Sequence, residues 1–144
     1  PILLNFKKIS MEKTRVNLGL LILRVTLGIL MLFHGFSKMM NGLEGIKGML
    51  ESYGLLSVIA YGVLIGEVIV PILLVVGFRT RIAALVYAIN MLIAVMLVHI
   101  NDIFTLSTTG GWTLELQGLY FFGALALFFT GAGKFAVSVS NRWD

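Results

Sequence analysis

Two kinds of residue are scarce in this chain of 144 residues. It has no cysteine, so it forms no disulfide, iron–sulfur cluster or dithiol redox centre, and any redox chemistry has to use a bound cofactor or a partner's. Only 12% of its residues are charged, whereas 58% are apolar and the mean hydropathy is +0.98. This balance excludes an ordinary soluble domain and predicts an integral membrane protein.

The chain also lacks a basic face that could neutralise the phosphates of nucleic acid, in spite of its formal net charge of +4. Its eleven Lys and Arg lie in short tracts beside apolar runs, which is the distribution that membrane proteins show. We therefore expect the lipid bilayer as its surroundings and no nucleic-acid partner.

Four apolar segments are long enough to cross about 30 Å of hydrocarbon as helices, the last one barely. They are residues 17–40, 56–78, 82–100 and 113–130. Only Arg79, Thr80 and Arg81 separate the second segment from the third, so these two must be antiparallel neighbours. The sequence thus predicts an all-α domain over residues 17–134, an antiparallel bundle of four transmembrane helices with tails at 1–16 and 135–144. Because Met11 has the character of a natural start, we expect residues 1–10 to be an upstream extension.

Basic residues are unevenly divided between the two ends of these helices. Lys38 and Lys47 fall on one side, and the remaining basic residues that flank the segments fall on the other. These are Lys7, Lys8, Lys13, Arg15, Arg79, Arg81, Lys134 and Arg142. The positive-inside rule then predicts that both termini are cytoplasmic.

A few ionisable residues fall within the apolar segments, where each costs about 3 kcal/mol unless it is partnered. They are Arg24, His34, Lys38, Glu67, His99 and Glu115. Their predicted depth and the predicted orientation of the helices place the two histidines, Lys38 and Glu115 in the outer half of the bundle. Glu67 lies deeper, and Arg24 lies deeper still, toward the cytoplasmic side. We expect a connected polar cluster that opens outward. The alternative is that each ionisable residue is accommodated separately, with the long side chains extending to the membrane–water interface.

One face of the first segment carries Arg24, His34 and Lys38 within an arc of about 120°. Gly28 and Gly35 lie on the same face and would let a second helix approach closely. Glu67 is too deep to reach water, so it needs Arg24, Lys38 or a proton as its partner.

Several short motifs in order along the chain carry a resemblance to a known family. They are Arg24, Gly28, His34 to Lys38, Gly66-Glu67, Gly77 to Arg81, His99, Glu115 and Gly131 to Lys134. The chain resembles the DoxX family of small four-helix bacterial membrane proteins from Leu18 to Ser138. The resemblance implies a multi-pass protein of the bacterial cytoplasmic (inner) membrane, and some relatives belong to membrane oxidoreductases that pass electrons to quinone beside partner subunits.

Three functions suit these residues, and no catalytic residue is assigned. The first is binding of a quinone or similar amphiphile, with His34 or His99 donating a hydrogen bond and Glu67 or Glu115 relaying protons. The second is a non-catalytic subunit that stabilises or docks a larger membrane complex. The third is translocation of a small molecule or a proton. We expect no intrinsic cofactor and no metal, because the Glu-x-x-His pairs of a di-iron bundle are missing; a haem held by the two histidines is a minor alternative.

Overall fold

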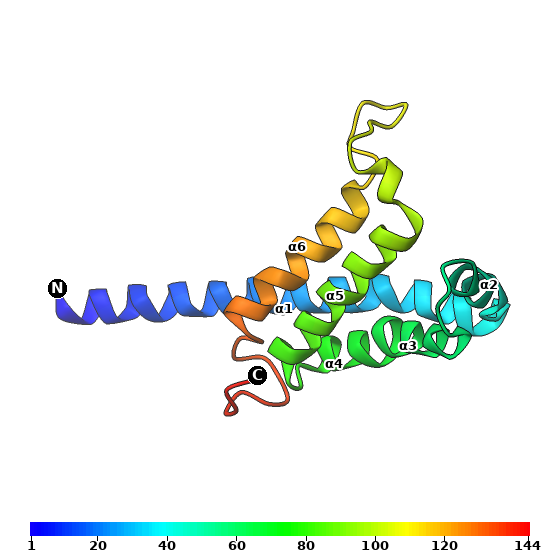
Figure 1. The fold of residues 1–144 in the computed structure, drawn as a ribbon. Helices are drawn as coiled ribbons and strands as arrows, with labels where there is room; N and C mark the ends of the chain where they lie inside the picture. Colours follow the sequence, from blue (N-terminus) through cyan, green and yellow to red (C-terminus); the bar gives the residue numbers. More distant parts are fainter.

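The computed structural model describes all 144 residues, and every regular element in it is a helix (Figure 1). The long elements are α1 (Ile2–Asn41), α5 (Thr80–Val98) and α6 (Glu115–Thr130). A continuous helical stretch from Ser57 to Val76 consists of η1 (Ser57–Ile59), α3 (Ala60–Leu64), the π-helical turn η2 (Ile65–Ile69) and α4 (Val70–Val76). Two short elements, α2 (Glu44–Ser52) and η3 (Ile100–Asp102), lie in the connections.

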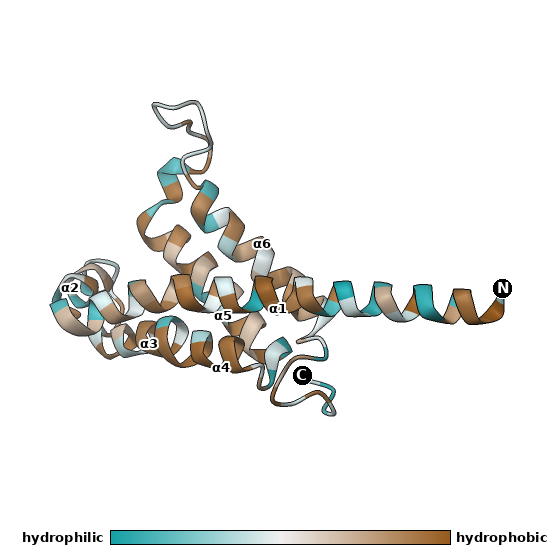
Figure 2. Cartoon of the chain, turned by 180° about the vertical axis from the view of Figure 1, so that it is seen from behind, coloured by the Kyte–Doolittle hydropathy of each residue, from teal (hydrophilic) through white to brown (hydrophobic).

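Three of these helical stretches are long and apolar enough to cross a membrane. They are Ile2–Asn41, Ser57–Val76 and Thr80–Val98, whereas the apolar helix α6 has 16 residues. Figure 2 shows apolar residues distributed around all of these helices. Their outward faces expose large side chains such as Phe33, Phe122 and Leu119, as contact with lipid requires. The chain is therefore an all-α membrane protein.

The helices form two packed pairs that cross each other (Figure 1). In one pair α1 runs antiparallel to η2 and α4, and in the other α5 runs antiparallel to α6. The pairs meet beside the turn between α4 and α5, where the C-terminal segment also lies, and they diverge toward the opposite end. We call these the closed end and the open end.

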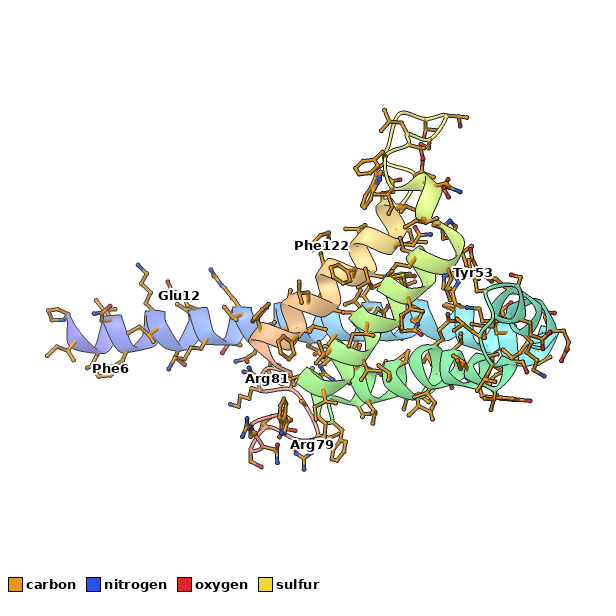
Figure 3. The ribbon with its side chains drawn as sticks, viewed as in Figure 1. Phe6, Glu12, Tyr53, Arg79, Arg81 and Phe122 are labelled. Atoms are coloured by element: carbon orange, nitrogen blue, oxygen red, sulfur yellow. The ribbon has the colours of Figure 1, made fainter.

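Helix α1 begins earlier than the apolar segment that predicted it. No Gly or Pro interrupts residues 2–18, so nothing in the sequence stops the helix before Asn17. This first stretch projects beyond the other helices, and Phe6 and Glu12 extend from it without a neighbouring element (Figure 3).

The buried core lies where the two pairs touch. Its members are Leu27, Met31, Val70, Leu74, Ala83, Ala84, Tyr87, Ala88, Met91, Tyr120, Ala124 and Leu127. The alanines all come from α5 and α6, and their small side chains let the crossing helices approach. Tyr87 is fully buried, and its hydroxyl donates to the carbonyl oxygen of Leu27 at 3.1 Å.

Two glycines of α1 set its distance from the second span, as expected from the sequence. A Cβ at Gly28 would lie 2.8 Å from the Pro71 carbonyl oxygen, and one at Gly35 would lie 2.3 Å from the Glu67 carbonyl oxygen. Both distances are shorter than any real contact, so α1 and the second span pack backbone to backbone.

The connection over residues 41–55, for which no helix was predicted, contains α2. Leu43 and Leu50 are buried against Ala60, and Ile46 packs on the same small cluster. Because these apolar residues recur at helical spacing, they cover the open end with a short amphipathic helix.

Candidate ligand-binding site

A cavity of about 400 Å³ lies at the open end, between the diverging helix pairs. Its wall comes from α1, α2, α3, η2, α5 and α6, and it is mostly apolar, with Met31, Met49 and Leu97 among its members. The polar groups in the wall are His34, Lys38, Glu67, Asn90, His99, Gln117 and Tyr120. An apolar wall with a few converging polar groups is typical of small-molecule sites of this size.

Glu67 and Lys38 form an ion pair in this wall, between Oε1 of the carboxylate and Nζ of the ammonium. The Glu67 side chain is only 7% exposed, whereas that of Lys38 is 33% exposed. The second carboxylate oxygen, Oε2, is buried and has no hydrogen-bond partner. Buried polar atoms are almost always paired, so a residue of the cavity wall carries an acceptor that is left unsatisfied.

The fold places Glu67 through a local break in the second span. Glu67 lies in the π-helical turn η2, and Pro71, four residues later, has no N–H to donate to the Glu67 carbonyl. A single π-turn is rare and is often found at functional sites. The same carbonyl faces Gly35, so α1 presses directly on the turn that carries the carboxylate.

Asn90 lies against this turn from the other helix pair. A Cβ at Gly66 would be 2.5 Å from the Asn90 side-chain oxygen, so only glycine leaves room for the amide beside Glu67. The site is thus built from both pairs, with Glu67 on one and Asn90 on the other.

Both histidines reach the wall of this one cavity. The His34 ring stands edge-on to Tyr120 with centroids 6.2 Å apart, and Tyr120 contacts Tyr87 in the same way at 6.1 Å. The His99 ring nitrogen Nδ1 lies 3.0 Å from a carboxylate oxygen of Asp102, which fixes the orientation of its ring. His34, Lys38, Glu67 and His99 are therefore brought together as the sequence predicts.

Arg24 lies outside this cavity. It is 1% exposed, and it donates through Nη1 to the carbonyl oxygens of Leu74 at 2.8 Å and Val75 at 2.7 Å. Its Nη2 donates to the Phe135 carbonyl. The expected continuity of the polar cluster down to Arg24 is absent, because backbone carbonyls at the end of α4 bind this guanidinium instead of Glu67.

Glu115 also lies apart from the cavity. It sits in the exposed first turn of α6, with its carboxylate beside Gly111, and it has no ion-pair partner. The sequence predicts its end of the helix bundle correctly, but Glu115 does not join the cluster, because it is not on the face of α6 where Gln117 and Tyr120 line the cavity.

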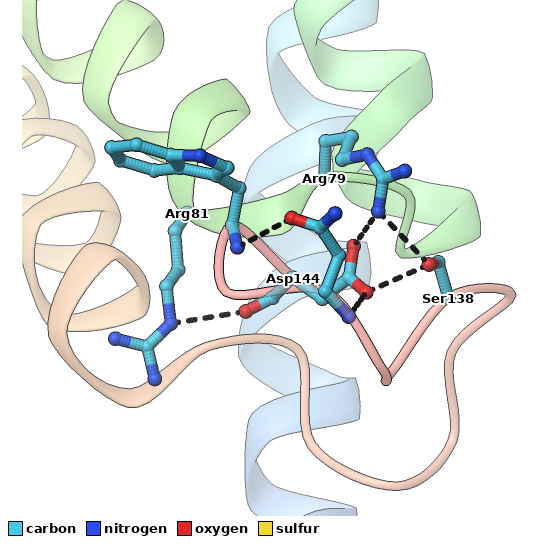
Figure 4. Close-up of polar contacts among 6 residues, drawn as sticks. Arg79, Arg81, Ser138 and Asp144 are labelled. Atoms are coloured by element: carbon cyan, nitrogen blue, oxygen red, sulfur yellow. Dashed lines mark hydrogen bonds and ion pairs between the residues drawn. The ribbon is translucent and has the colours of Figure 1, made fainter.

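The C-terminal segment forms a polar cluster at the closed end (Figure 4). Arg79 donates to one carboxylate oxygen of Asp144 at 2.9 Å, and the Ser138 hydroxyl and Asn141 N–H donate to the other, each at 2.7 Å. Burial raises the pKa of Asp144, but the hydrogen bonds from Ser138, Asn141 and Arg79 outweigh it and lower the pKa to about 2. We call this cluster the C-terminal latch.

Comparison with known proteins identifies the family. The DoxX family model matches residues 19–100, which include the four residues gathered at the cavity. The chain belongs to the DoxX family. A protein of Bacillus subtilis (strain 168) named "Putative oxidoreductase CatD" is 36% identical over 103 residues, which cover 72% of this chain and 76% of the relative. No solved structure matches the chain.

Three polar residues of the DoxX site were missed in the sequence, namely Asn90, Gln117 and Tyr120. Each interrupts an otherwise apolar segment, so the sequence does contain a signal for it. Neutral polar groups cost less free energy to bury than charges, so they indicate a site less strongly. No three His, Asp or Glu side chains are grouped as a metal site would need.

Proposed function

We propose that this DoxX protein binds a quinone or a similar amphiphile in the cavity and serves as the membrane subunit of an oxidoreductase. The observation that carries the proposal is the Glu67–Lys38 ion pair in the wall of a mostly apolar cavity, with the buried Oε2 of Glu67 left without a partner. The apolar wall suits a ring and tail, and the polar groups suit the ring oxygens.

The two sides of the ion pair would serve different forms of the ligand. A quinone carbonyl accepts hydrogen bonds, which Lys38, His34 or His99 would donate. A quinol hydroxyl donates one, which Oε2 of Glu67 would accept. Reduction of a quinone takes up two electrons and two protons. Glu67 and the histidines would hand over protons, while the electrons would come from the redox centre of a partner subunit.

The relative's name supports the oxidoreductase part of the proposal. The relative is named "Putative oxidoreductase CatD", and the residues that the family model matches span the cavity residues His34, Lys38, Glu67 and His99. Because this chain has no cysteine, electrons have to come from a bound cofactor or from a partner with its own redox cofactor, and we propose the partner.

We further propose that α6 is a fourth span and that both termini lie in the cytoplasm of a bacterial cell, with the protein in its inner membrane. Helix α6 is about 24 Å long at 1.5 Å per residue, close to the hydrocarbon thickness. The closed end carries Arg79, Arg81, Lys134 and Arg142, and the positive-inside rule favours the cytoplasm for that end. The cavity would then lie in the outer half of the membrane.

The test compares Glu67→Gln with Glu44→Gln. Glutamine keeps the shape at position 67 and an acceptor for Lys38, but it removes the negative charge. Glu44 pairs with Lys47 on an exposed face of α2 and does not line the cavity, so its variant is a matched control. Wild type, purified gently, should retain extractable quinone and bind decylubiquinone or menaquinone-4.

We expect Glu67→Gln to weaken quinone binding by about tenfold or more, the loss of one hydrogen bond to a charged group, and Glu44→Gln to leave it unchanged. If wild type retains no quinone and binds neither probe, the quinone proposal is wrong. Co-purification of the same partner subunits with wild type and Glu67→Gln would then favour a purely structural subunit.

A further inference from the structure

A second cavity, of about 460 Å³, lies at the closed end, between the last turn of α6 and the C-terminal segment. Its wall includes Arg81, Lys134 and Arg142, together with residues 130–133, Asn141 and Asp144. Both α5 and α6 have their closed-end termini here, so the cavity lies at the level where the spans leave the hydrocarbon. It shares no residue with the cavity that contains Glu67.

None of the three cations in this wall forms an ion pair with an Asp or Glu side chain. The ion pairs of the molecule are Lys38–Glu67, Lys47–Glu44, Arg79–Asp144 and His99–Asp102, and none involves them. Arg81 donates only through Nε, to the Asp144 carbonyl oxygen at 3.1 Å, and Figure 4 shows its two outer nitrogens directed away from that contact.

The carboxylate in the wall does not neutralise them. Asp144 is already bound by Arg79, Ser138 and the Asn141 N–H, which occupy both of its oxygens. The cavity is thus lined by three positive charges whose hydrogen-bond donors are largely unused. Such a site attracts an anion with several acceptor oxygens, such as a phosphate group.

Exposed apolar side chains lie in the wall of this cavity, at Val139, and near its wall residues along the chain. Phe129 of α6 is 68% exposed and Val137 of the C-terminal segment is 75% exposed, with Val139 and Trp143 also exposed. In a membrane protein these residues lie beside acyl chains or at the interface, where tryptophan is common. A phosphate that is attached to acyl chains would therefore satisfy the cations and the apolar rim together.

We propose that this basic cavity binds the phosphate of an anionic phospholipid, such as phosphatidylglycerol, at the closed end of the helix pairs. Basic pockets between helix ends recognise such headgroups in membrane proteins, and each Lys or Arg near the membrane surface contributes about fivefold to affinity. A lipid bound there would contact both the C-terminal segment and the end of α6, and would hold the two together at the membrane surface.

The test measures lipid binding to the full chain in detergent by native mass spectrometry and thermal unfolding. The probes are phosphatidylglycerol, phosphatidylcholine with the same acyl chains, and inorganic phosphate. The variant is Lys134→Gln/Arg142→Gln, because neither side chain makes a hydrogen bond within the protein and the fold should persist. The matched control is Lys7→Gln/Lys8→Gln, which removes the same charge from the projecting part of α1.

We expect wild type and the control to retain phosphatidylglycerol in preference to phosphatidylcholine, with a higher unfolding temperature when it is added. The cavity variant should bind phosphatidylglycerol about 25-fold more weakly, from two factors of about five. Stabilisation by inorganic phosphate equal to that by the lipid would assign the site to a free phosphate and overturn the lipid proposal. Equal loss in the cavity and control variants, or no preference for the anionic lipid in wild type, would also overturn it.

Discussion

The closed and open ends of the helix pairs deal with buried charge in opposite ways. At the closed end, Arg24 is held by three backbone carbonyls, and the carboxylate of Asp144 is held by Arg79, Ser138 and Asn141. At the open end, Glu67 has one partner and an unbound oxygen that is buried beside a cavity. Arg24 also has one buried nitrogen without a partner, Nε, but three carbonyls bind its other donors, whereas Glu67 has a single partner. A charge that several groups of the fold hold serves stability, whereas one with few partners is available to a ligand.

The connections explain why one end closes and the other does not. Between α4 and α5 the chain turns within a few residues, with Gly77 at φ 75° and Arg79 at φ 49°, both in the left-handed region. So tight a turn holds the two pairs together. At the open end the connections are longer, over residues 42–56 and 99–114, and they allow the pairs to diverge. The cavity is the space that this divergence leaves under α2.

Replacement of Arg24 by leucine is the strongest way to break the closed end. The carbonyls of Leu74, Val75 and Phe135 would lose their donor, which should cost about 3 kcal/mol of unfolding free energy at about 1 kcal/mol for each hydrogen bond. Thermal or denaturant unfolding of the purified protein measures this. Arg24→Lys keeps the positive charge but has fewer hydrogen-bond donors, so its unfolding free energy should lie between those of wild type and Arg24→Leu.

The same variant also sharpens the comparison between the ends. Arg24 does not line the cavity, so quinone binding by folded Arg24→Leu should stay within about twofold of wild type. Loss of quinone binding with unchanged stability would mean that the two ends act as one site, contrary to the comparison drawn here.

At the open end, Gly35→Ala tests the packing that holds Glu67. The added methyl carbon would lie 2.3 Å from the Glu67 carbonyl oxygen, so α1 must move away, at a cost of about 2 kcal/mol. Because the turn that carries Glu67 moves too, quinone affinity should fall together with stability. Both quantities can be measured on the same preparation.

Gly19→Ala is the matched control on the same helix. Nothing lies within 4 Å of a Cβ at Gly19, so this change should only improve helix propensity, by up to about 1 kcal/mol. If Gly35→Ala were as harmless as Gly19→Ala, the close approach of α1 would not determine the position of the carboxylate.

The main features of the fold could be predicted because they follow from large free-energy costs of placing single backbone groups and charges in lipid. Long apolar segments have to be helices in lipid, and Gly28 and Gly35 on one face of α1 indicated where a second helix would approach closely. Glu67 needed a partner, and of the options that the sequence offered, Lys38 is the one that the structure shows. The gathering of His34, Lys38, Glu67 and His99 was predicted from their depth together with the orientation of the segments.

The features that the sequence did not predict depend on the helix face that a residue occupies and on contacts with backbone groups. Arg24 was expected to extend the cluster, but its partners are carbonyl oxygens, which no side-chain pattern indicates. The π-turn at Glu67 has one signal in the sequence, Pro71 four residues later. Glu115 shares the depth of the histidines and yet faces outward, since depth does not fix the face of a helix.

The smallest expected effect concerns the C-terminal latch at the closed end. The pKa of Asp144 is about 2 in the folded protein, against 3.8 ordinarily, so its carboxylate stabilises the latch fully above pH 4. As the pH falls from about 4 to about 2, the detached segment takes up a proton before the docked one does, and the contribution is lost. Trp143 fluorescence in a Trp112→Phe background should report this detachment while the helices stay folded. Asp144→Asn removes the titrating group, so its signal should stay flat across this range; the same pH profile in both proteins would show that another group controls the latch.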